Sequence, residues 1–481
     1  MDGRALPPAA ALWAVLLAGG CVQGPNYTKP TVAVPAQYRS GGGLVGTTPT
    51  SDEAWWNGFG DEYLDGLVRE ALATNRDLRI ATGRVDEFAA VLAGTRSQKF
   101  PQVGYALGGT RSRTSEELLP PLVDPLSSTF SSFLSASWEV DLWGRIRRET
   151  EAAKANLLAS EEARRGVTLT LISAVVASYV TLLDLDEQLR VAEATVAGRQ
   201  KSVDLFETRL AGRWISEFEM SQVRAEYESV ASQLPPLRQA IAVQEHALSV
   251  LLGRNPGPIE RSAGLESMRS PLVPAGLPSD LLIRRPDILQ AEQQLIASNA
   301  LIGAARALFF PRISLTGLLG FASGSLGNLF TGPARSWTFT GDVAGPIYTG
   351  GGITAAVDQA EARRDQAFAN YELVIQNAFR DVEDSLADLR HSAELRETAQ
   401  RRVAVLRRGL ELANERYENG YSDYLEVLDT ERGLFSAELQ LASAWGDYQR
   451  ALVNLYRALG GDWSAVPPSA ASSASRGTGD R

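Results

Sequence analysis

The sequence is poor in the residues that most enzyme and metal sites need. It has one cysteine and two histidines among 481 residues. This excludes a disulfide framework and a cysteine–histidine metal site, because each needs several such residues close together. Neither His246 nor His391 lies in a nucleophile motif, so we expect no catalytic histidine and no cofactor. The net charge of −10 and the lack of a basic run argue against nucleic acid as a partner, because phosphate binding needs clustered cations.

Long apolar runs are also lacking. Beyond the N-terminus, no stretch of about 20 apolar residues predicts a membrane-spanning helix. The N-terminal run ALPPAAALWAVLLAGG ends in small residues directly before Cys21, which predicts a secretory signal peptide over residues 1–20. Leu17–Cys21 (LAGGC) resembles a bacterial lipobox, so Cys21 is the expected lipidation site and would carry palmitate or a related acyl chain. The alternative is a free, buried cysteine in an ordinary secreted protein.

Two short motifs resemble enzyme motifs but lack the flanking elements or residues that such motifs need. Gly41–Gly46 matches G-x-G-x-x-G, but it follows no predicted strand and opens no predicted helix, so we interpret it as a flexible loop. Ser325 lacks the leading glycine of a nucleophile elbow. We therefore expect a protein that is not an enzyme.

The chain contains an internal repeat. Asn75–Gly104 matches Arg285–Ser314 at an offset of 210, and Arg209–Gly253 matches Arg416–Gly460 at an offset of 207. Ordered offsets of this kind predict two copies of one unit of about 200 residues. The predicted organisation is an acylated segment at 21–60, repeat 1 at 61–256, repeat 2 at 257–464 and a disordered tail at 465–481.

Each repeat contains a pair of segments that alternate with period two, which predicts β-hairpins at 103–142 and 312–347. Their lengths suit strands that cross a bilayer. Four strands cannot close a barrel, so several chains would have to contribute if the strands face lipid. The alternative is a soluble hairpin with one wet face.

Very long helices follow each hairpin, at 145–251 and 353–459. The stretches 145–209 and 353–417 contain no proline, so each could extend on the order of 95 Å. Pro235 and Pro236 should kink the return helix of the first repeat. The helices alone would also suit a structural coiled-coil lipoprotein of the periplasm, which has no use for four alternating strands.

Four stretches carry a family resemblance: Cys21–Pro30 (CVQGPNYTKP), Trp55–Asp61, Arg284–Gly317 and Glu415–Phe435. Together they resemble the outer membrane factors, the TolC-like channels of Gram-negative efflux pumps, in their NodT/OprM-type lipoprotein branch. The resemblance covers about residues 21–464.

This resemblance implies an α+β membrane protein with an internal duplication. Three chains would form a homotrimer whose 12-stranded outer-membrane β-barrel, with four strands from each chain, continues into a long periplasmic α-helical barrel. The protein would be lipid-anchored in the outer membrane and extend into the periplasm. It would act as a passive exit duct for drugs and toxic compounds, docked to a periplasmic adaptor and an inner-membrane transporter of the RND type. A type I protein-secretion duct is the alternative within the channel class.

The resemblance also assigns site residues at the periplasmic end. Leu425, Glu426 and Asp429 would form the pore constriction. Asp429 corresponds to Gln222 in the first repeat, so each chain would contribute one acid and the acidic ring would be threefold. The alternative for Asp429 is a solvated acid near a helix end. The residues expected to contact the adaptor are Arg209, Arg213, Glu219, Arg416, Gly420 and Asp423. Arg213 stands where the second repeat has Gly420.

Overall fold

The computed structural model describes residues 22–40, 55–120, 124–262, 264–271, 278 and 281–461. The expected signal peptide, Cys21, the Gly41–Gly46 motif and the tail at 465–481 lie outside the described residues. The chain divides into two compact units. The sheet unit comprises Met1–Val32, Gly83–Glu161 and Gln290–Leu373, and the helical unit comprises Ala33–Thr82, Glu162–Leu289 and Val374–Arg481.

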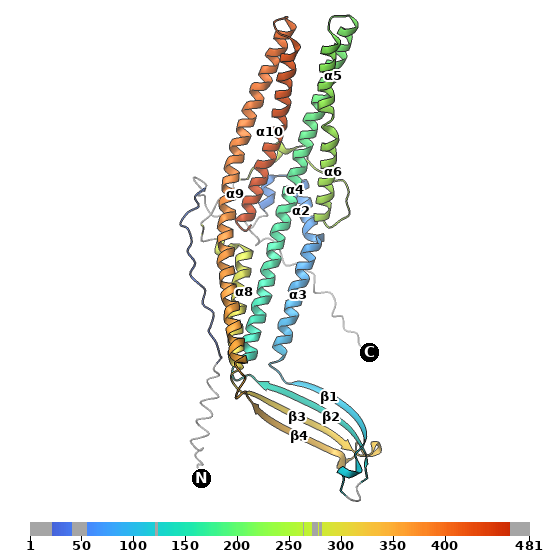
Figure 1. The fold of residues 1–481 in the computed structure, drawn as a ribbon, viewed down its shortest axis with the longest axis vertical. Helices are drawn as coiled ribbons and strands as arrows, with labels where there is room; N and C mark the ends of the chain where they lie inside the picture. The colour runs from blue at the N-terminus through green and yellow to red at the C-terminus, as the bar shows by residue number, and fades with distance from the viewer. Residues whose placement is uncertain are drawn as a thin grey trace. The chain divides into compact units, whose positions relative to one another are not determined.

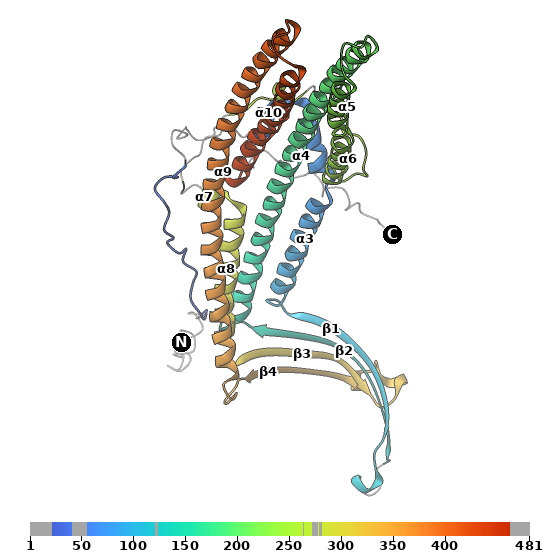
Figure 2. The same cartoon turned by 45° about the horizontal axis from the view of Figure 1, so that its top comes forward.

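The sheet unit holds four antiparallel strands in the order β1-β2-β3-β4, which lie side by side in a curved sheet (Figure 1, Figure 2). They are β1 (Gln102–Arg113), β2 (Leu126–Val140), β3 (Arg312–Ser323) and β4 (Arg335–Ala344). The second hairpin ends at Ala344 rather than at the predicted residue 347. Gly345 and Pro346 follow, and proline has no amide hydrogen to continue a ladder. β1 and β4 are the edges of the sheet: among the described residues each pairs with one strand and has its other edge unpaired.

The two faces of the sheet differ in chemistry because neighbouring residues point to opposite sides of a strand. One face, here called the apolar face, carries large side chains that are mostly exposed: Val103, Tyr105, Leu107, Leu134, Leu315, Leu319, Trp337, Phe339 and Val343. The other, the hydroxyl face, carries Ser131, Ser135, Ser137, Thr316, Thr338 and Thr340 together with glycines. One apolar and one polar face is the pattern of a strand set between lipid and water.

Two helices precede the first hairpin and three follow it: α2 (Glu62–Thr74), α3 (Arg76–Ser97), α4 (Arg145–Ala211), α5 (Glu217–Ala231) and α6 (Leu234–Leu251). The second half repeats this order with α7 (Leu281–Arg284), α8 (Pro286–Ala307), α9 (Gly352–Glu418) and α10 (Tyr424–Ala458). The short 3-10 helices are η1 (Trp55–Phe59), η2 (Glu116–Leu118), η3 (Leu265–Ser267), η5 (Leu326–Asn328) and η6 (Gly332–Ala334).

The return helix of the first half is interrupted rather than kinked, which corrects the sequence prediction. α5 ends at Ala231 and α6 begins at Leu234, so Pro235 and Pro236 lie in the first turn of a new helix. Proline is tolerated there because a first-turn amide has no helical partner to lose. The second half has no proline at this position, and α10 runs unbroken for 35 residues.

Matching hydrogen bonds in the helical unit relate the two halves. The Asn75 side-chain amide donates to the carbonyl of Leu251 (2.8 Å), and the Arg285 guanidinium donates to that of Ala458 (3.0 Å). These donors are 210 residues apart and the acceptors 207 apart, as in the sequence repeat. Different side chains therefore perform the same task of tying a helix start to a helix end.

One helix in the described part of the chain, α4, contains an 18-residue window that is apolar enough to cross a membrane by length and composition. The expectation that no such stretch follows the N-terminus was wrong by this criterion. The window is 56% buried within the protein, and it includes core residues such as Val175, Val176 and Val180. A helix packed on neighbours from several sides has the same composition.

Candidate functional site

The two helix–helix turns, α4–α5 and α9–α10, share one backbone geometry. The amide of Arg213 donates to the carbonyl of Leu210 (2.9 Å), and the amide of Gly420 donates to that of Tyr417 (3.0 Å). Both residues are left-handed, with φ of +60° at Arg213 and +72° at Gly420. Arg213 is the one non-glycine residue with positive φ in the described part of the chain. Arg213 and Gly420, which correspond in the sequence repeat, therefore also share a backbone conformation.

Each turn exposes large apolar side chains at equivalent positions. Trp214 and Tyr421 are 83% and 78% exposed, and one helical turn later Phe218 and Leu425 are 70% and 50% exposed. Exposed large apolar side chains that cluster on a surface are typical of protein contact sites. The turns thus present two similar apolar surfaces rather than one.

The start of α5 is held by a capping box. The Ser216 hydroxyl accepts from the amide of Glu219 (3.2 Å), while the Glu219 carboxylate accepts from the amide of Ser216 (2.8 Å). The carboxylate also accepts from the Ser216 hydroxyl (2.9 Å). The hydrogen bonds that the carboxylate accepts from Ser216, the one from the backbone amide first, lower the pKa of Glu219. In the second turn the N-cap residue Asp423 makes no such bond. Glu219, expected at the adaptor contact, thus also closes the first turn of its helix.

The expected constriction residues lie in the first two turns of α10. Glu426 forms an ion pair with Nε of Arg416 (3.1 Å), so a constriction residue and a tip residue are joined. Leu425 and Asp429 are exposed and four residues apart, so they share one side of the helix. The side chain of Asp429 makes no ion pair or hydrogen bond with any described residue. Its carboxylate is therefore available to a partner outside this chain.

Arg209 occupies a different environment from the other tip residues. Its guanidinium donates to the Tyr417 hydroxyl (2.5 Å) and its carbon Cζ lies 5.4 Å from the centre of the Phe206 ring. Tyr424 packs against Phe206 with ring centres 4.3 Å apart and the ring planes tilted by 41°. Arg209 therefore links α4 to α9 through an aromatic cluster and is half-buried, whereas Arg213 is exposed.

A buried ion network below the turns was not expected from the sequence. Arg199 of α4 is almost fully buried; its guanidinium contacts the Glu431 carboxylate and lies 3.8 Å from that of Glu226. Nε of Arg432 donates to Glu226 (2.5 Å). Burial lowers the pKa of Arg199, and the neighbouring Glu226 opposes that shift. The network joins α4, α5 and α10; each charge alone looks like an ordinary solvated helix residue in the sequence.

Among the described residues no group of three or more histidines, cysteines or acids is placed to hold a metal ion. The arrangement of the helix turns is instead one of exposed apolar and acidic side chains. It suits contact with other chains.

Comparison with known proteins gives a consistent result. A family model described as "Outer membrane efflux protein" matches residues 67–254 and 277–461. The chain is 36% identical over 474 residues to the solvent efflux pump outer membrane protein SrpC of Pseudomonas putida, with 96% of this chain and 99% of that protein covered. It is 38% identical over 453 residues to the cation efflux system protein CusC of Escherichia coli K12, with 92% and 96% covered.

Solved structures agree with these relatives. The open state of the MtrE outer membrane channel of Neisseria gonorrhoeae has a TM-score of 0.84 and 30% identity, covering 92% of this chain and 99% of that one. The outer-membrane channel OprN has a TM-score of 0.85 and 29% identity, covering 92% and 100%.

Proposed function

Because the chain belongs to the outer membrane efflux protein family, we propose that it forms the homotrimeric exit duct of a tripartite pump. The family expected from the sequence is confirmed, and the protein is an outer-membrane channel of an efflux system. The alternatives, a type I secretion duct and a coiled-coil lipoprotein, are not favoured. The trimer, its lipid anchor and the roles of individual residues are the proposal.

One observation carries the trimer: a four-stranded sheet with one exposed apolar face and two unpaired edges. In lipid, an unpaired strand edge leaves backbone groups without partners, at several kcal/mol for each. A closed 12-stranded barrel would arise if β4 of one chain pairs with β1 of the next. The apolar face would then meet lipid and the hydroxyl face would line the lumen.

Contacts near the N-terminus support a lipid anchor at Cys21. Arg148, almost fully buried at the start of α4, donates from Nε to the carbonyl of Gln23 (3.0 Å). The same guanidinium donates to the carbonyl of Gly24 (3.1 Å) and to the Asn26 side chain (2.9 Å). The chain directly after Cys21 is thus held next to the end of β2, where the lipid-facing strands begin. An acylated Cys21 at this height would reach the inner leaflet of the outer membrane.

At the periplasmic end, we propose that Leu425, Glu426 and Asp429 from three chains narrow the duct. Three unpaired carboxylates near one axis repel one another and attract cations. The residues proposed for the adaptor contact are Arg209, Arg213, Glu219, Arg416, Gly420 and Asp423. Of these, exposed Arg213 and Gly420 are the best placed, because Arg209 is occupied with Tyr417.

We propose small molecules as cargo, without a preference set by this chain. The names of the relatives include solvent, toluene, cation and antibiotic efflux. Because one fold occurs with such different cargo, selection would lie with the inner-membrane transporter.

Membrane fractionation followed by native mass spectrometry tests this function. The protein, expressed with its own N-terminus, should co-sediment with outer membranes, carry acyl mass on Cys21 and run as a trimer in mild detergent. A monomer in the soluble periplasmic fraction would overturn the proposal. A Cys21→Ser variant is the control for acylation, because serine offers no thiol to acylate.

A further inference from the structure

The apolar face of the sheet ends in cations. Arg111 and Arg113 lie near the end of β1, and Arg335 begins β4. In the strand register Phe321 pairs with Arg335 and with Ser132, which pairs with Leu107. Alternation therefore places all three arginines on the same side as the large apolar residues and opposite the hydroxyl face.

These arginines lie at the end of the sheet away from the helices. α3 leads into β1, β2 leads into α4, α8 leads into β3, and β4 leads into α9. All four helix connections therefore occur at one end of the sheet, and the two hairpin loops lie at the other. If the helices extend into the periplasm, the arginine end of the apolar face is at the outer leaflet.

The rows of apolar side chains match the height of a bilayer. From the Ile313 row to the Phe130 row, the register contains six rows on this face. Five intervals of about 6.7 Å along strands tilted by about 40° give a band roughly 25 Å tall. Arg111 lies one row beyond this band, which places it at the level of lipid headgroups.

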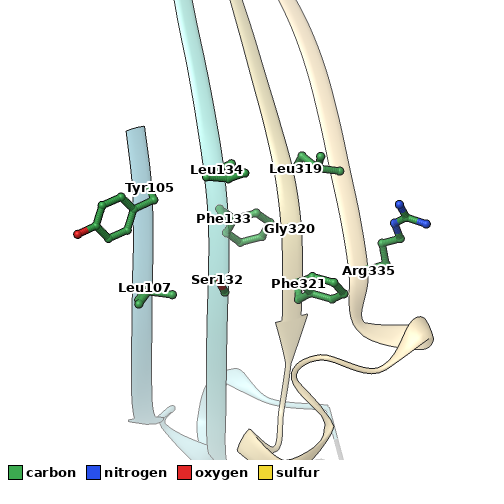
Figure 3. Close-up of a pocket in the computed structure, with 9 residues that line it drawn as sticks. All are labelled: Tyr105, Leu107, Ser132, Phe133, Leu134, Leu319, Gly320, Phe321 and Arg335. Atoms are coloured by element: carbon green, nitrogen blue, oxygen red, sulfur yellow. The ribbon is translucent and has the colours of Figure 1, made fainter. Parts of the chain in front are cut away.

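Beside Arg335 the apolar face is hollowed. A cavity of about 320 Å³ is lined by Tyr105, Leu107, Leu134, Leu319, Phe321 and Arg335, among others (Figure 3). In the close-up, Arg335 stands at one border of this groove and Tyr105 at the opposite border. Phe330 of the outer loop packs edge-on against Phe321, with ring centres 5.5 Å apart. An apolar floor with a cation at its rim suits an amphiphile with an anionic head.

Two of the three arginines at this end of the apolar face have no acidic partner among the described residues. Arg113 is paired with Glu116 (2.9 Å), but Arg111 and Arg335 form no ion pair with a described residue. Both are exposed. A guanidinium binds phosphate oxygens through two parallel hydrogen bonds. Arg111 lies at headgroup height, and Arg335 lies two rows below it, with a long side chain that can extend toward the headgroups. Both are therefore well matched to a phosphorylated lipid.

We infer that this groove binds a phosphorylated glycolipid of the outer leaflet, of the lipid A class. An acyl chain would lie over Leu107, Leu319 and Phe321, and a phosphate would be held by Arg335. The inference rests on the proposed trimer, in which β4 of one chain lies next to β1 of the next. Arg335 would then share the rim with Arg111 of the neighbouring subunit.

Lipid titration with native mass spectrometry on the full-length protein in detergent tests this inference. The probes are bisphosphorylated lipid A and the same lipid A with both phosphates removed. The wild type should prefer the phosphorylated form. Arg335→Gln should weaken that binding about fivefold, and adding Arg111→Gln should weaken it further, since each cation near a lipid surface contributes a similar factor. Binding of dephosphorylated lipid A should not change.

Arg312→Gln is the matched control, because Arg312 is also an exposed strand arginine but lies at the helix end of β3 on the hydroxyl face. It should bind lipid A like the wild type. Equal affinity of the wild type and the double variant, or an equal loss in Arg312→Gln, would overturn the inference.

If Arg335→Gln fails to assemble, Arg335→Lys replaces it, because lysine keeps the positive charge but lacks the two parallel N–H donors of the guanidinium. The single variants Arg335→Lys and Arg111→Gln should then each bind phosphorylated lipid A more weakly than the wild type, with unchanged trimer content. Wild-type affinity in both variants would count against the site. A protein that is trimeric in the outer membrane but indifferent to phosphate would contradict this inference alone. A protein absent from that membrane would contradict the proposed function.

Discussion

Arg213 and Gly420 occupy the same left-handed position in two helix–helix turns, 207 residues apart. Each donates its amide to the carbonyl three residues earlier, at 2.9 and 3.0 Å. Only glycine adopts this conformation without a steric cost from Cβ, which is about 1 kcal/mol for other residues. The first turn therefore carries strain that the second lacks.

Replacing Arg213 with glycine should stabilise the α4–α5 turn by about 1 kcal/mol, because the left-handed strain disappears. The measurement is hydrogen exchange of the amides around residues 209–220. Gly420→Ala is the reciprocal variant and should destabilise its own turn, since nothing else lies within 4 Å of the added Cβ to compensate. Lower protection in Arg213→Gly would show that the arginine side chain contributes more than its backbone costs.

Asp429→Ala should raise the single-channel conductance in planar bilayers. The variant removes one exposed carboxylate from each chain, and with it the cation binding that would hold ions back at the proposed constriction. Unchanged conductance would remove Asp429 from the constriction.

Asp388→Ala is the control for this variant. Asp388 is an exposed acid in the interior of α9, 30 residues before the Glu418 end of that helix, and its loss should leave the conductance at the wild-type value. Gln222→Asp supplies the acidic twin that the first repeat lacks, and it should change the conductance in the opposite direction to Asp429→Ala.

The start of α5 should loosen in acid. The pKa of Glu219 is lowered from its ordinary value of 4.5, so its carboxylate stabilises the folded turn fully above that value. This stabilisation is lost as the pH falls through the lower, folded-state pKa. Protection factors of the amides in residues 216–220 should therefore drop as the pH falls below about 4.5 toward the lowered pKa of Glu219.

Glu219→Gln should remove that pH dependence while leaving the α10 start unaffected. Ser216→Ala should weaken the turn by about 1 kcal/mol at neutral pH, since it deletes the other half of the capping box. Identical acid profiles for the wild type and Glu219→Gln would show that another group controls this turn.

Several parts of the fold could be predicted because they depend on local pattern. The absence of proline over 353–417 matches α9, which runs from Gly352 to Glu418 and accommodates Gly409 in its interior. The alternation around Val103 and Tyr105 matches β1. The prediction of a kink at Pro235 was wrong, because one helix ends before the two prolines and a new helix begins with them in its first turn. The roles of Cys21 and of the adaptor-contact residues stay predictions.

The ion network of Arg199, Glu226 and Glu431 could not be predicted. Its members lie 27 and 205 residues apart along the chain from one another, and each stands among ordinary helix charges. Which charges meet depends on how α4, α5 and α10 rotate about their own axes, and that rotation is set by packing of the whole bundle. The same holds for Arg209, which packing directs to Tyr417.

The sequence by itself determined the duplication, the alternating strands, the long helices and the family, because each is written in periodicity or in motifs of neighbouring residues. The scarcity of cysteine and histidine likewise predicts no catalytic histidine and no cysteine–histidine metal site. Only the tertiary structure decided which cations are paired and which are not. Arg335 and Arg111 are spaced far apart in the chain, and the strand register alone places both on the apolar face, at its outer end. Their free charge follows from three-dimensional neighbours, which no local pattern specifies.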